Sequence, residues 1–491
     1  MSKAGRTRFV FATLLAFVWL SVTGRKVQAE ERLFNRFFQL GGIYIKFLQI
    51  LAVRESDKQV KMAGLEDSMA VFDQVKYEPI DIIKLLRAEL GHRATEVVIA
   101  DPNPFAAGSF GQVYSGVVEG QEVIIKVLRP SVDEFLEFDL NLLGKVARII
   151  SFVMPRSIVN FKAVFNDLKR VSLQEIDYHN EVKNAVRLYE KLADHPVIHI
   201  PKTYEELSTD HIIVQEKVTG LPLTQLLSST IEDKLDFVWQ NYGTNLNYVM
   251  EELAVESLMG SLSENGSHGD PHPGNIFVMP NNRIALIDFG IDSAVHEYKP
   301  ELMQLIVEYS ALYRGQFNPT NFSKAMLCYF APQLTQSMQT LSTFLNKNDL
   351  AEQILDEVGL KASESLQDRA SDPAVSTMLG QYRMLAIFTQ VINKDNRFGL
   401  RVVIDTPEFL RSTQIFLNLV HLLGCDKRLI GNTFDRVIAS YDFTTQTQGP
   451  SYDSQSIDSS LHSVASWFER LQYSDPALYD NIMRRWRGLP I

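Results

Sequence analysis

The chain has few cysteines and no clusters of basic residues. It contains only two cysteines, Cys328 and Cys425, in 491 residues, which excludes a disulfide framework and a cysteine-rich zinc site. Its formal net charge is −11, and it lacks the clustered Lys and Arg that binding a polyanion requires, so we expect no nucleic-acid partner. Hydrophobic residues make up 45% and charged residues 22% of the chain, which is typical of a folded protein.

Long apolar runs are also missing, with one short exception near the N-terminus. The apolar stretch from Phe9 to Val22 has about fourteen residues, fewer than the ~20 that a full membrane span needs. Basic residues stand on both sides of this stretch, namely Lys3, Arg6, Arg8, Arg25 and Lys26. Residues 1–30 therefore predict an apolar targeting or membrane-anchor segment, with an ordinary apolar helix as the alternative, and cleavage of the segment stays open.

The rest of the chain divides by its hydrophobic pattern into helical and strand-rich parts. Apolar residues recur at three- and four-residue spacing after residue 31, which predicts helices. β-branched runs at Val97-Val98-Ile99 and Val123-Ile124-Ile125 surround a glycine-containing turn and predict strands. The length suits a two-lobed catalytic unit of roughly 250 residues with flanking elements. We place the parts as an N-terminal helical extension at 31–95, an N-lobe at 96–220, a C-lobe at 221–345 and a helical C-terminal extension at 346–491.

A run of small residues between the two predicted strands resembles a phosphate-binding loop. Its spacing follows the pattern G-x-G-x-x-G-x-V, except that Ala106 replaces the first glycine. Small residues let backbone N–H groups approach phosphate oxygens, although a simple hairpin turn is the alternative. The candidate nucleotide contacts are Ala106, Ala107, Gly108, Ser109, Gly111 and Val113.

Lys126 follows the second predicted strand and stands thirteen residues after Val113. A lysine at this position can bind the α- and β-phosphates of a nucleotide. Such a lysine needs a carboxylate on a helix to hold it, and the following helical region offers Glu175, Asp177 and Glu181. Composition alone does not choose among these three.

The most informative run of the chain covers residues 268–275 and reads His-Gly-Asp-Pro-His-Pro-Gly-Asn. Asp270 and Asn275 have the five-residue offset of a kinase catalytic loop, in which Asp270 would orient or deprotonate an acceptor and Asn275 would hold Mg²⁺. Asp288 opens an Asp-Phe-Gly triplet thirteen residues after Asn275 and would bind the metal that bridges the terminal phosphates, because hard oxygen donors suit Mg²⁺. The ordered set predicts phosphoryl transfer, and His268 and His272 are expected to shape the loop by hydrogen bonds.

Little chain follows this triplet before the next anchor motif. Lys299-Pro300-Glu301 arrives only about ten residues after Gly290, whereas a conventional protein kinase places a long activation segment between the corresponding motifs. The short segment leaves little chain to dock a peptide, so we expect a substrate other than a protein.

Taken together, these motifs resemble the UbiB family of atypical kinases, also called aarF-domain kinases, over about residues 35–300. The residues that carry the resemblance are Lys46-Phe47-Leu48-Gln49, Glu175-Ile176-Asp177, the 268–275 run and Leu286-Ile287-Asp288-Phe289-Gly290. The resemblance implies an α+β, bilobal protein-kinase-like fold with N-terminal and C-terminal helical extensions.

The resemblance also implies roles for residues that would otherwise read as a solvated helix face. Lys46 and Gln49 would fold over the nucleotide site, with Lys46 approaching Glu175 or Asp177, while Glu181 would pair with Lys126. Two positions depart from the family pattern. Leu48 replaces a glycine of the motif, and Gly108 stands in a loop that the family makes alanine-rich, so the choice between ATP and ADP stays open.

In function, the resemblance implies an atypical kinase or ATPase that uses ATP (or ADP) and Mg²⁺ and supports ubiquinone or another prenyl-lipid pathway. We expect it to be membrane-associated on the side that is accessible to nucleotide. Its expected partners are the nucleotide, a membrane lipid or prenyl-quinone precursor, and proteins of a lipid-biosynthesis complex. Two alternatives stay open: a nucleotide-binding pseudokinase that acts as a regulatory module, and a protein kinase that phosphorylates in trans.

Overall fold

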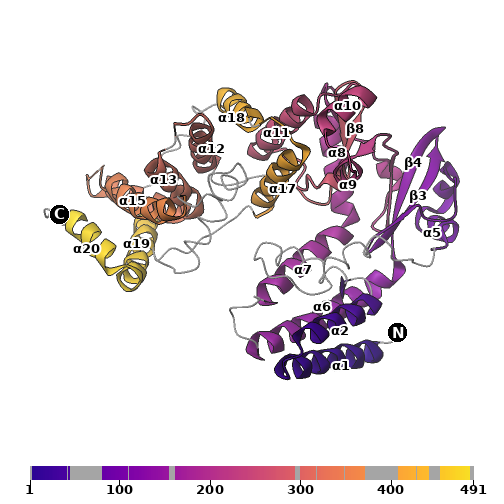
Figure 1. Cartoon of the computed structure of the whole chain (residues 1–491), viewed down its shortest axis with the longest axis horizontal. Coiled ribbons are helices and arrows are strands. Elements are labelled where there is room, and N and C mark those ends of the chain that lie inside the picture. The colour runs from indigo at the N-terminus through magenta and orange to yellow at the C-terminus, as the bar shows by residue number, and fades with distance from the viewer. Residues whose placement is uncertain are drawn as a thin grey trace. The chain divides into compact units, whose positions relative to one another are not determined.

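The chain divides into two units in the computed structural model, each with its own sheet and helices (Figure 1). Unit 1 consists of Met1–Tyr189 and Pro201–Val218, and unit 2 consists of Glu190–Ile200 and Thr219–Ile491. The residues that the structure describes are 3–40, 43–44, 80–108, 110–153, 161–293, 299–316, 318–347, 349–370, 407–426, 428–441 and 454–486.

Unit 1 combines helices at its N-terminal end with an antiparallel sheet. Its elements are α1 (Lys3–Val22), α2 (Lys26–Leu40), α5 (Ile82–Leu90), η1 (Gly91–Glu96), β1 (Val97–Ile99), β2 (Ala106–Ala107), β3 (Gly111–Val118), β4 (Gln121–Leu128), α6 (Pro130–Val153), α7 (Phe161–Ile176), most of α8 (Tyr178–Lys191), η2 (Glu205–Leu207) and β6 (Ile212–Glu216).

The sheet of unit 1 has five strands in the order β1-β3-β4-β6, with β2 paired to β3. Side chains alternate between its faces, as expected for strands. In β4, Val123, Ile125 and Val127 are buried with α5 residues such as Ile82 and Leu86 in one core. The alternation therefore places Lys126 on the opposite face of the sheet from this core.

The apolar N-terminal stretch is helix α1, which packs with α2 and α6 in unit 1 (Figure 1). One face of α1 is buried in a core that it shares with these helices, through Val10, Leu14, Phe17 and Leu20. Helix α2 runs through residue 30, so the predicted targeting segment and the helical extension share a helix. Among the described residues, no helix combines the length and apolar character needed to cross a membrane.

A buried polar cluster fixes α1 to α6. Arg6 donates to both carboxylate oxygens of Asp139, with the Nε–Oδ1 distance at 3.0 Å. The hydroxyl of Tyr44 donates to the same carboxylate at 3.0 Å. Asp139 is only 2% exposed and Tyr44 is fully buried, and this burial raises the pKa of Tyr44. The charge of Asp139 is tolerated in the core because Arg6 neutralises it.

Unit 2 has a small sheet followed by helices. Its elements are β5 (Ile198–His199), β7 (Leu221–Pro222), α9 (Leu223–Ser228), α10 (Lys234–Tyr242), α11 (Leu246–Leu262), η3 (Pro273–Asn275), β8 (Ile276–Met279), β9 (Arg283–Leu286), α12 (Lys299–Tyr313), α13 (Pro319–Phe330), α14 (Pro332–Phe344), α15 (Leu350–Ala370), α17 (Pro407–Leu423), α18 (Arg428–Ser440), α19 (Ser454–Ser474) and α20 (Pro476–Trp486).

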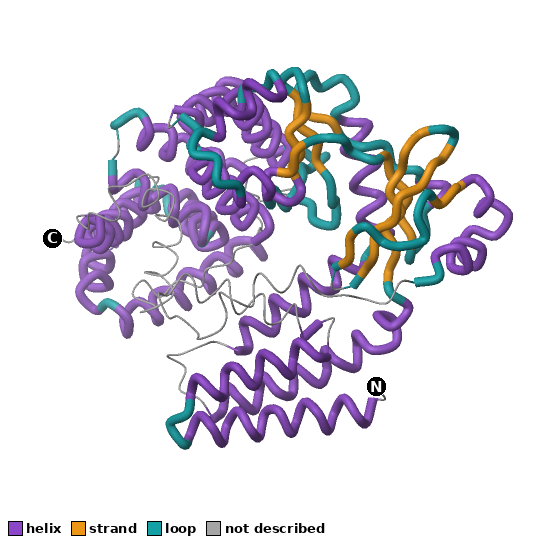
Figure 2. Tube along the Cα trace, turned by 45° about the vertical axis from the view of Figure 1, so that its right-hand side comes forward, coloured by secondary structure: helices purple, strands orange, loops and turns teal. Residues whose placement is uncertain are grey.

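The sheet of unit 2 has four strands in the order β5-β9-β8-β7, with β5 parallel to β9 and the other pairs antiparallel. In the tube view the strands are orange, and helices make up most of the described chain (Figure 2). The β8–β9 hairpin is central to the unit because β8 follows the predicted catalytic loop and β9 leads into Asp288. The start of β8 lies beside the end of β9, so the hairpin brings the two predicted motifs close together.

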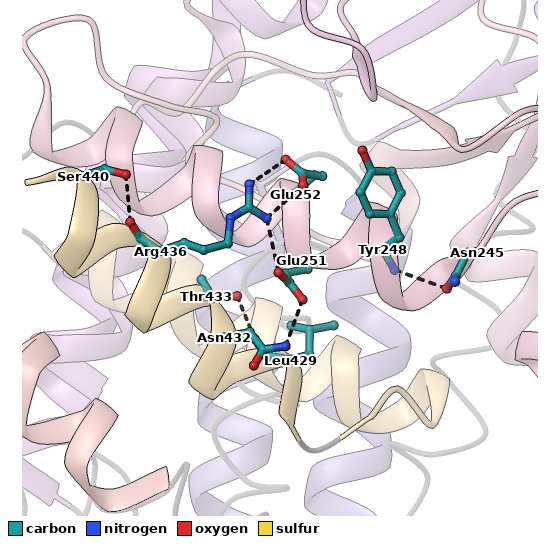
Figure 3. Close-up of polar contacts among 9 residues, drawn as sticks. All are labelled: Asn245, Tyr248, Glu251, Glu252, Leu429, Asn432, Thr433, Arg436 and Ser440. Atoms are coloured by element: carbon teal, nitrogen blue, oxygen red, sulfur yellow. Dashed lines mark hydrogen bonds and ion pairs between the residues drawn. The ribbon is translucent and has the colours of Figure 1, made fainter. Parts of the chain in front are cut away.

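Helix α18 of the C-terminal region packs on α11 within unit 2 (Figure 3). Arg436 donates to Glu252 at 2.8 and 3.1 Å and to Glu251 at 3.2 Å. Asn432 donates to Glu251 as well. The side chain of Arg436 is 42% exposed, so these contacts lie where water competes with them.

Candidate nucleotide and magnesium sites

In unit 1, the structure brings Lys126 and Glu181 together. The Nζ atom of Lys126 lies 2.7 and 2.9 Å from the two carboxylate oxygens of Glu181. Lys126 comes from β4 and Glu181 from the first turn of α8, where a carboxylate also interacts favourably with the helix dipole. Glu181 is buried, whereas the side chain of Lys126 is 26% exposed. The pair holds the ammonium group in a fixed place with part of its surface open to a ligand.

Tyr178 completes the surroundings of this ion pair. Its ring lies 5.1 Å from Nζ of Lys126, in cation–π geometry. Its hydroxyl lies next to the backbone of β3, because a Cβ atom built on Gly111 would come within 2.9 Å of it. Gly111 was predicted as a phosphate contact. The structure shows that it also lets α8 approach the sheet closely.

The small-residue loop forms the start of the β2–β3 hairpin. Ala106 pairs with Val113, and Val113 stands directly opposite Lys126 on β4. Ala106, Ala107 and Gly108 are exposed, and a Cβ atom on Gly108 would meet no described atom within 4 Å. The packing of the described residues does not require glycine at position 108. The open space fits the close approach of a ligand to the backbone.

Arg129 holds the same loop from the end of β4. Its guanidinium donates to the carbonyl oxygens of Gly108 and Gly111, at 3.2 and 3.5 Å. Its backbone N–H donates to the carbonyl of Phe110. Sequence reasoning missed Arg129, although a basic residue that follows a strand lysine so closely is a signal that could have been considered.

Of the remaining predicted residues of the N-terminal half, the structure describes Asp177 and Glu175. Asp177 accepts a hydrogen bond from the backbone N–H of Asn180 at 3.0 Å and so caps the start of α8. Glu175 lies half-buried at the end of α7. Lys46, Gln49 and Ser109 lie outside the described residues.

In unit 2, the 268–275 loop is fastened to the segment around Asp288. The backbone N–H of Ile287 donates to the carbonyl of Asn275 at 3.0 Å, and Gly269 donates to Ile291 at 2.9 Å. A Cβ atom on Gly269 would lie 2.6 Å from the side chain of Ile291, so only glycine permits this approach. These contacts fix the two predicted motifs of unit 2 relative to each other.

His268 links the same two segments through both ring nitrogens. Nδ1 accepts from the backbone N–H of Asp270 at 3.3 Å, so Nε2 carries the proton and donates to the carbonyl of Ile287 at 2.9 Å. The ring also meets Phe289 edge to face at 5.4 Å. His272 accepts from the N–H of Gly274 at 3.1 Å. Both histidines shape the loop by hydrogen bonds, as the sequence predicts.

Asp288 has a backbone conformation that is uncommon for residues other than glycine. Its φ is 65°, in the left-handed region, which costs energy for a residue with a Cβ and persists only where the surroundings enforce it. Asp288 is exposed, while Phe289 and Gly290 after it are buried. Asp288 is thus exposed at a point where the backbone is strained, and no local sequence pattern indicates this conformation.

Asn275 and Asp288 fit a magnesium site by their chemistry. The amide Nδ2 of Asn275 donates to the carbonyl of Asp270 at 3.1 Å, so Oδ1 is the atom that can bind a metal. One amide oxygen and one carboxylate match the few protein ligands that Mg²⁺ takes when phosphates supply the others. No three His, Cys, Asp or Glu side chains of the described residues group into a metal site, and a nucleotide-bound Mg²⁺ does not require such a group.

Comparison with known proteins agrees with this geometry. Residues 70–314 match the ABC1 atypical kinase-like domain. This chain belongs to the ABC1, or aarF-domain, family. The predicted α+β kinase-like fold is thereby confirmed.

Among the relatives of this ABC1-family chain is an uncharacterized aarF domain-containing protein kinase, chloroplastic, of Arabidopsis thaliana. It is 25% identical over 398 residues, covering 79% of this chain and 71% of that protein. The probable protein kinase UbiB of Cellvibrio japonicus is 27% identical over 58% of this chain and 50% of that protein. The chain spans about half the length of this and other UbiB relatives. A solved complex of Rv3197 with erythromycin, from Mycobacterium tuberculosis, aligns over 63% of this chain and 75% of that one, with 22% identity and a TM-score of 0.42.

Proposed function

We propose that this chain is an atypical kinase or ATPase of the UbiB type that binds ATP (or ADP) with Mg²⁺. The observation that carries the proposal is the fastening of the 268–275 loop to the strained backbone at Asp288. These contacts join the segment that carries Asp270 and Asn275 to the segment that carries Asp288, which supports a common role for the three residues. The same residue types in the same order serve phosphoryl transfer in kinases.

In this proposal each residue takes the role that its motif predicts. Lys126, held by Glu181, binds the α- and β-phosphates, and the small residues from Ala106 to Val113 offer backbone N–H groups to the phosphates. Asn275 and Asp288 would hold the metal, and Mg²⁺ would supply charge neutralisation on the terminal phosphates. Asp270 orients the attacking water or acceptor hydroxyl and accepts its proton.

The acceptor in this proposal is water or a small molecule. Helix α12 begins at Lys299, only nine residues after Gly290. This short connection supports the view that the segment does not dock a peptide. We place the activity in ubiquinone or another prenyl-lipid pathway, at a membrane and on its nucleotide-accessible side, because several relatives carry the name UbiB. A prenyl-quinone precursor and proteins of a lipid-biosynthesis complex are its proposed partners.

The proposal is tested with Asp288→Asn. We expect magnesium-dependent nucleotide binding to weaken and phosphate release to fall about 100-fold or more, because an amide replaces the anionic metal ligand. Asp210→Asn is the matched control, since Asp210 is an exposed aspartate of unit 1 remote in sequence from every motif. It should leave both quantities unchanged.

The same assay separates the alternatives when it is repeated with vesicles and with prenyl phenols. Unchanged binding and hydrolysis in Asp288→Asn would remove the magnesium assignment. A wild-type chain that binds nucleotide and never releases phosphate, with or without lipid, would be a pseudokinase. Transfer of phosphate to a peptide would indicate a protein kinase.

A further inference from the structure

Helix α1 is apolar on two sides, and only one of them is used by the core. Val10, Leu14, Phe17 and Leu20 are buried in unit 1. On another side, Phe11, Leu15 and Trp19 are 37%, 71% and 60% exposed. Their four-residue spacing places these three side chains on one face. Arg8, also exposed, falls on the same face three residues before Phe11. We call Arg8, Phe11, Leu15 and Trp19 the outer face of α1.

The outer face is held outward by the contacts on the opposite side of the helix. Arg6 is bound to the buried Asp139, and its guanidinium stacks on the rings of Tyr44 and Phe135 at 5.7 and 5.1 Å. Turning or extracting α1 would leave the Asp139 carboxylate buried without its cation, which is strongly unfavourable. The outer face therefore stays outward while α1 lies along α6.

The described side chains of the neighbouring helix α2 differ from the outer face of α1. The exposed side chains described on α2 are polar, namely Gln28, Arg32, Asn35 and Gln39. Single exposed apolar residues are ordinary on a protein surface, but an aligned set that includes a tryptophan marks an interaction site. The two helices pack together, and among their described exposed side chains the large apolar ones are those of α1.

Charge identifies the kind of partner. The chain carries a net charge of −11, yet its first 29 residues contain no Asp or Glu. Lys3, Arg8 and Arg25 are exposed at the two ends of the outer face or on it. An apolar stripe with a tryptophan and flanking cations is the chemistry of helices that lie in the interface of an anionic bilayer.

The same charges disfavour a second copy as the partner. A two-fold pairing of outer faces would bring the same patch against itself. Cations would then face cations with no acidic residue of this segment to neutralise them, which is repulsive. An anionic lipid surface supplies both an apolar phase and the opposite charge.

We propose that the outer face of α1 docks parallel to an anionic lipid surface, with Phe11, Leu15 and Trp19 among the acyl chains and Arg8 at the headgroups. The inference rests on the membrane location proposed above and names the surface that makes the contact. It does not depend on nucleotide chemistry, so Asp288→Asn should bind vesicles as the wild type does. Failure of docking and failure of the kinase proposal are thus distinguishable.

The test is sedimentation of the full chain with vesicles of phosphatidylcholine, with and without phosphatidylglycerol. The wild type should bind the anionic vesicles, and binding should weaken as salt is added. Leu15→Glu/Trp19→Glu should lower binding about tenfold or more, because two inserted apolar groups become charged. The matched control is Leu422→Glu/Trp239→Glu, which changes a leucine and a tryptophan of unit 2 that are 59% and 57% exposed. It should bind as the wild type does.

Several outcomes would overturn the proposal. These are a wild type that ignores anionic vesicles, a Leu15→Glu/Trp19→Glu variant that binds them equally well, and an equal loss in the control. Light scattering would also overturn it if the wild type were a dimer and the variant a monomer, since a second copy would then cover the face. The thermal midpoint of the variant should match that of the wild type.

A second measurement reports how deeply Trp19 enters the bilayer. Brominated acyl chains should quench the fluorescence of the wild type on anionic vesicles. Trp19→Phe should keep the binding and lose most of this quenching, because phenylalanine preserves the apolar contact and removes the fluorophore. Quenching that persists in Trp19→Phe would contradict the placement of Trp19 among the acyl chains.

Discussion

Helix α1 near the N-terminus and helix α18 in the C-terminal region are attached by acid–base contacts of opposite kinds. In unit 1, Arg6 of α1 binds Asp139 of α6, which is buried. In unit 2, Arg436 of α18 binds Glu251 and Glu252 of α11 near the surface. Removing one partner of a buried pair leaves an uncompensated charge, whereas an exposed pair exchanges for water at little cost. Unit 1 therefore needs the Arg6–Asp139 contact for its stability, whereas unit 2 loses little stability without the ion pairs of Arg436.

Arg6→Met should have the largest effect, a loss of about 3–5 kcal/mol of stability, because the buried Asp139 loses its cation. Chemical unfolding followed by circular dichroism measures this loss. Arg6→Met/Asp139→Asn should recover much of it, since the amide is neutral and still accepts the hydrogen bond from Tyr44. A single variant as stable as the wild type would show that the contact is not required.

Glu181→Gln should separate function from stability within unit 1. Because Lys126 is partly exposed, its ion pair with Glu181 resembles the exposed pairs of Arg436 more than the buried pair of Arg6. We therefore expect the free energy of unfolding to fall by only about 1 kcal/mol. Turnover should fall about tenfold or more, since Lys126 loses the carboxylate that positions it. Glu190→Gln is the control, an exposed glutamate of the same helix. If both variants keep full turnover, the pair is structural only.

His195 of unit 2 is a titratable group whose burial lies between that of the Arg6–Asp139 pair and that of the Arg436 pairs. Burial lowers the pKa of His195, against the opposing effect of Glu256 and Glu252. Its Nδ1 accepts from the backbone N–H groups of Val197 and Ile198 at 3.2 and 3.0 Å. A histidine with a lowered folded pKa adds stability above its unfolded pKa of ~6.5, and this contribution is lost as the pH falls through that value toward the folded pKa.

The thermal midpoint should therefore fall on acidification from about pH 8 to about pH 5. His195→Asn should show a smaller fall, because its side-chain oxygen accepts the same hydrogen bonds and does not titrate. Equal pH dependence in the two proteins would show that His195 is not responsible.

Arg436→Ala should have the smallest effect, below about 1 kcal/mol, and the effect should shrink further as salt is added. A double-mutant cycle with Glu252→Gln measures the pair directly in chemical unfolding. A coupling as large as the effect of Arg6→Met would remove the contrast between the two attachments.

Local patterns predicted much of the fold. The runs at Val97–Ile99 and in β4 are strands, and alternation places Lys126 away from the core of the sheet. The spacing of Asp270, Asn275 and Asp288 predicted the motifs that unit 2 holds together. These features depend on residues that are close together in the sequence, so a local sequence pattern can predict them.

Contacts between distant residues were not predictable in the same way. The apolar stretch of α1 fits an anchor, a targeting peptide or a core helix. Its inner face is fixed by Asp139, which the local pattern does not contain. The approach of Tyr178 to Gly111 and the bond from His268 to Ile287 are also tertiary contacts. Aspartate tolerates the left-handed backbone better than most residues, but the residue type alone does not place it at Asp288.

The contact between Arg6 and Asp139 also has a consequence for synthesis. The two residues are 133 positions apart in the chain. At ribosomal rates of about 5–20 residues per second, Asp139 is added roughly 7–27 s after Arg6. During that interval α1 has neither its ionic partner nor the core residues of α6. In a newly made chain, the part of α1 that α6 later covers is therefore open to chaperones or lipid together with the outer face.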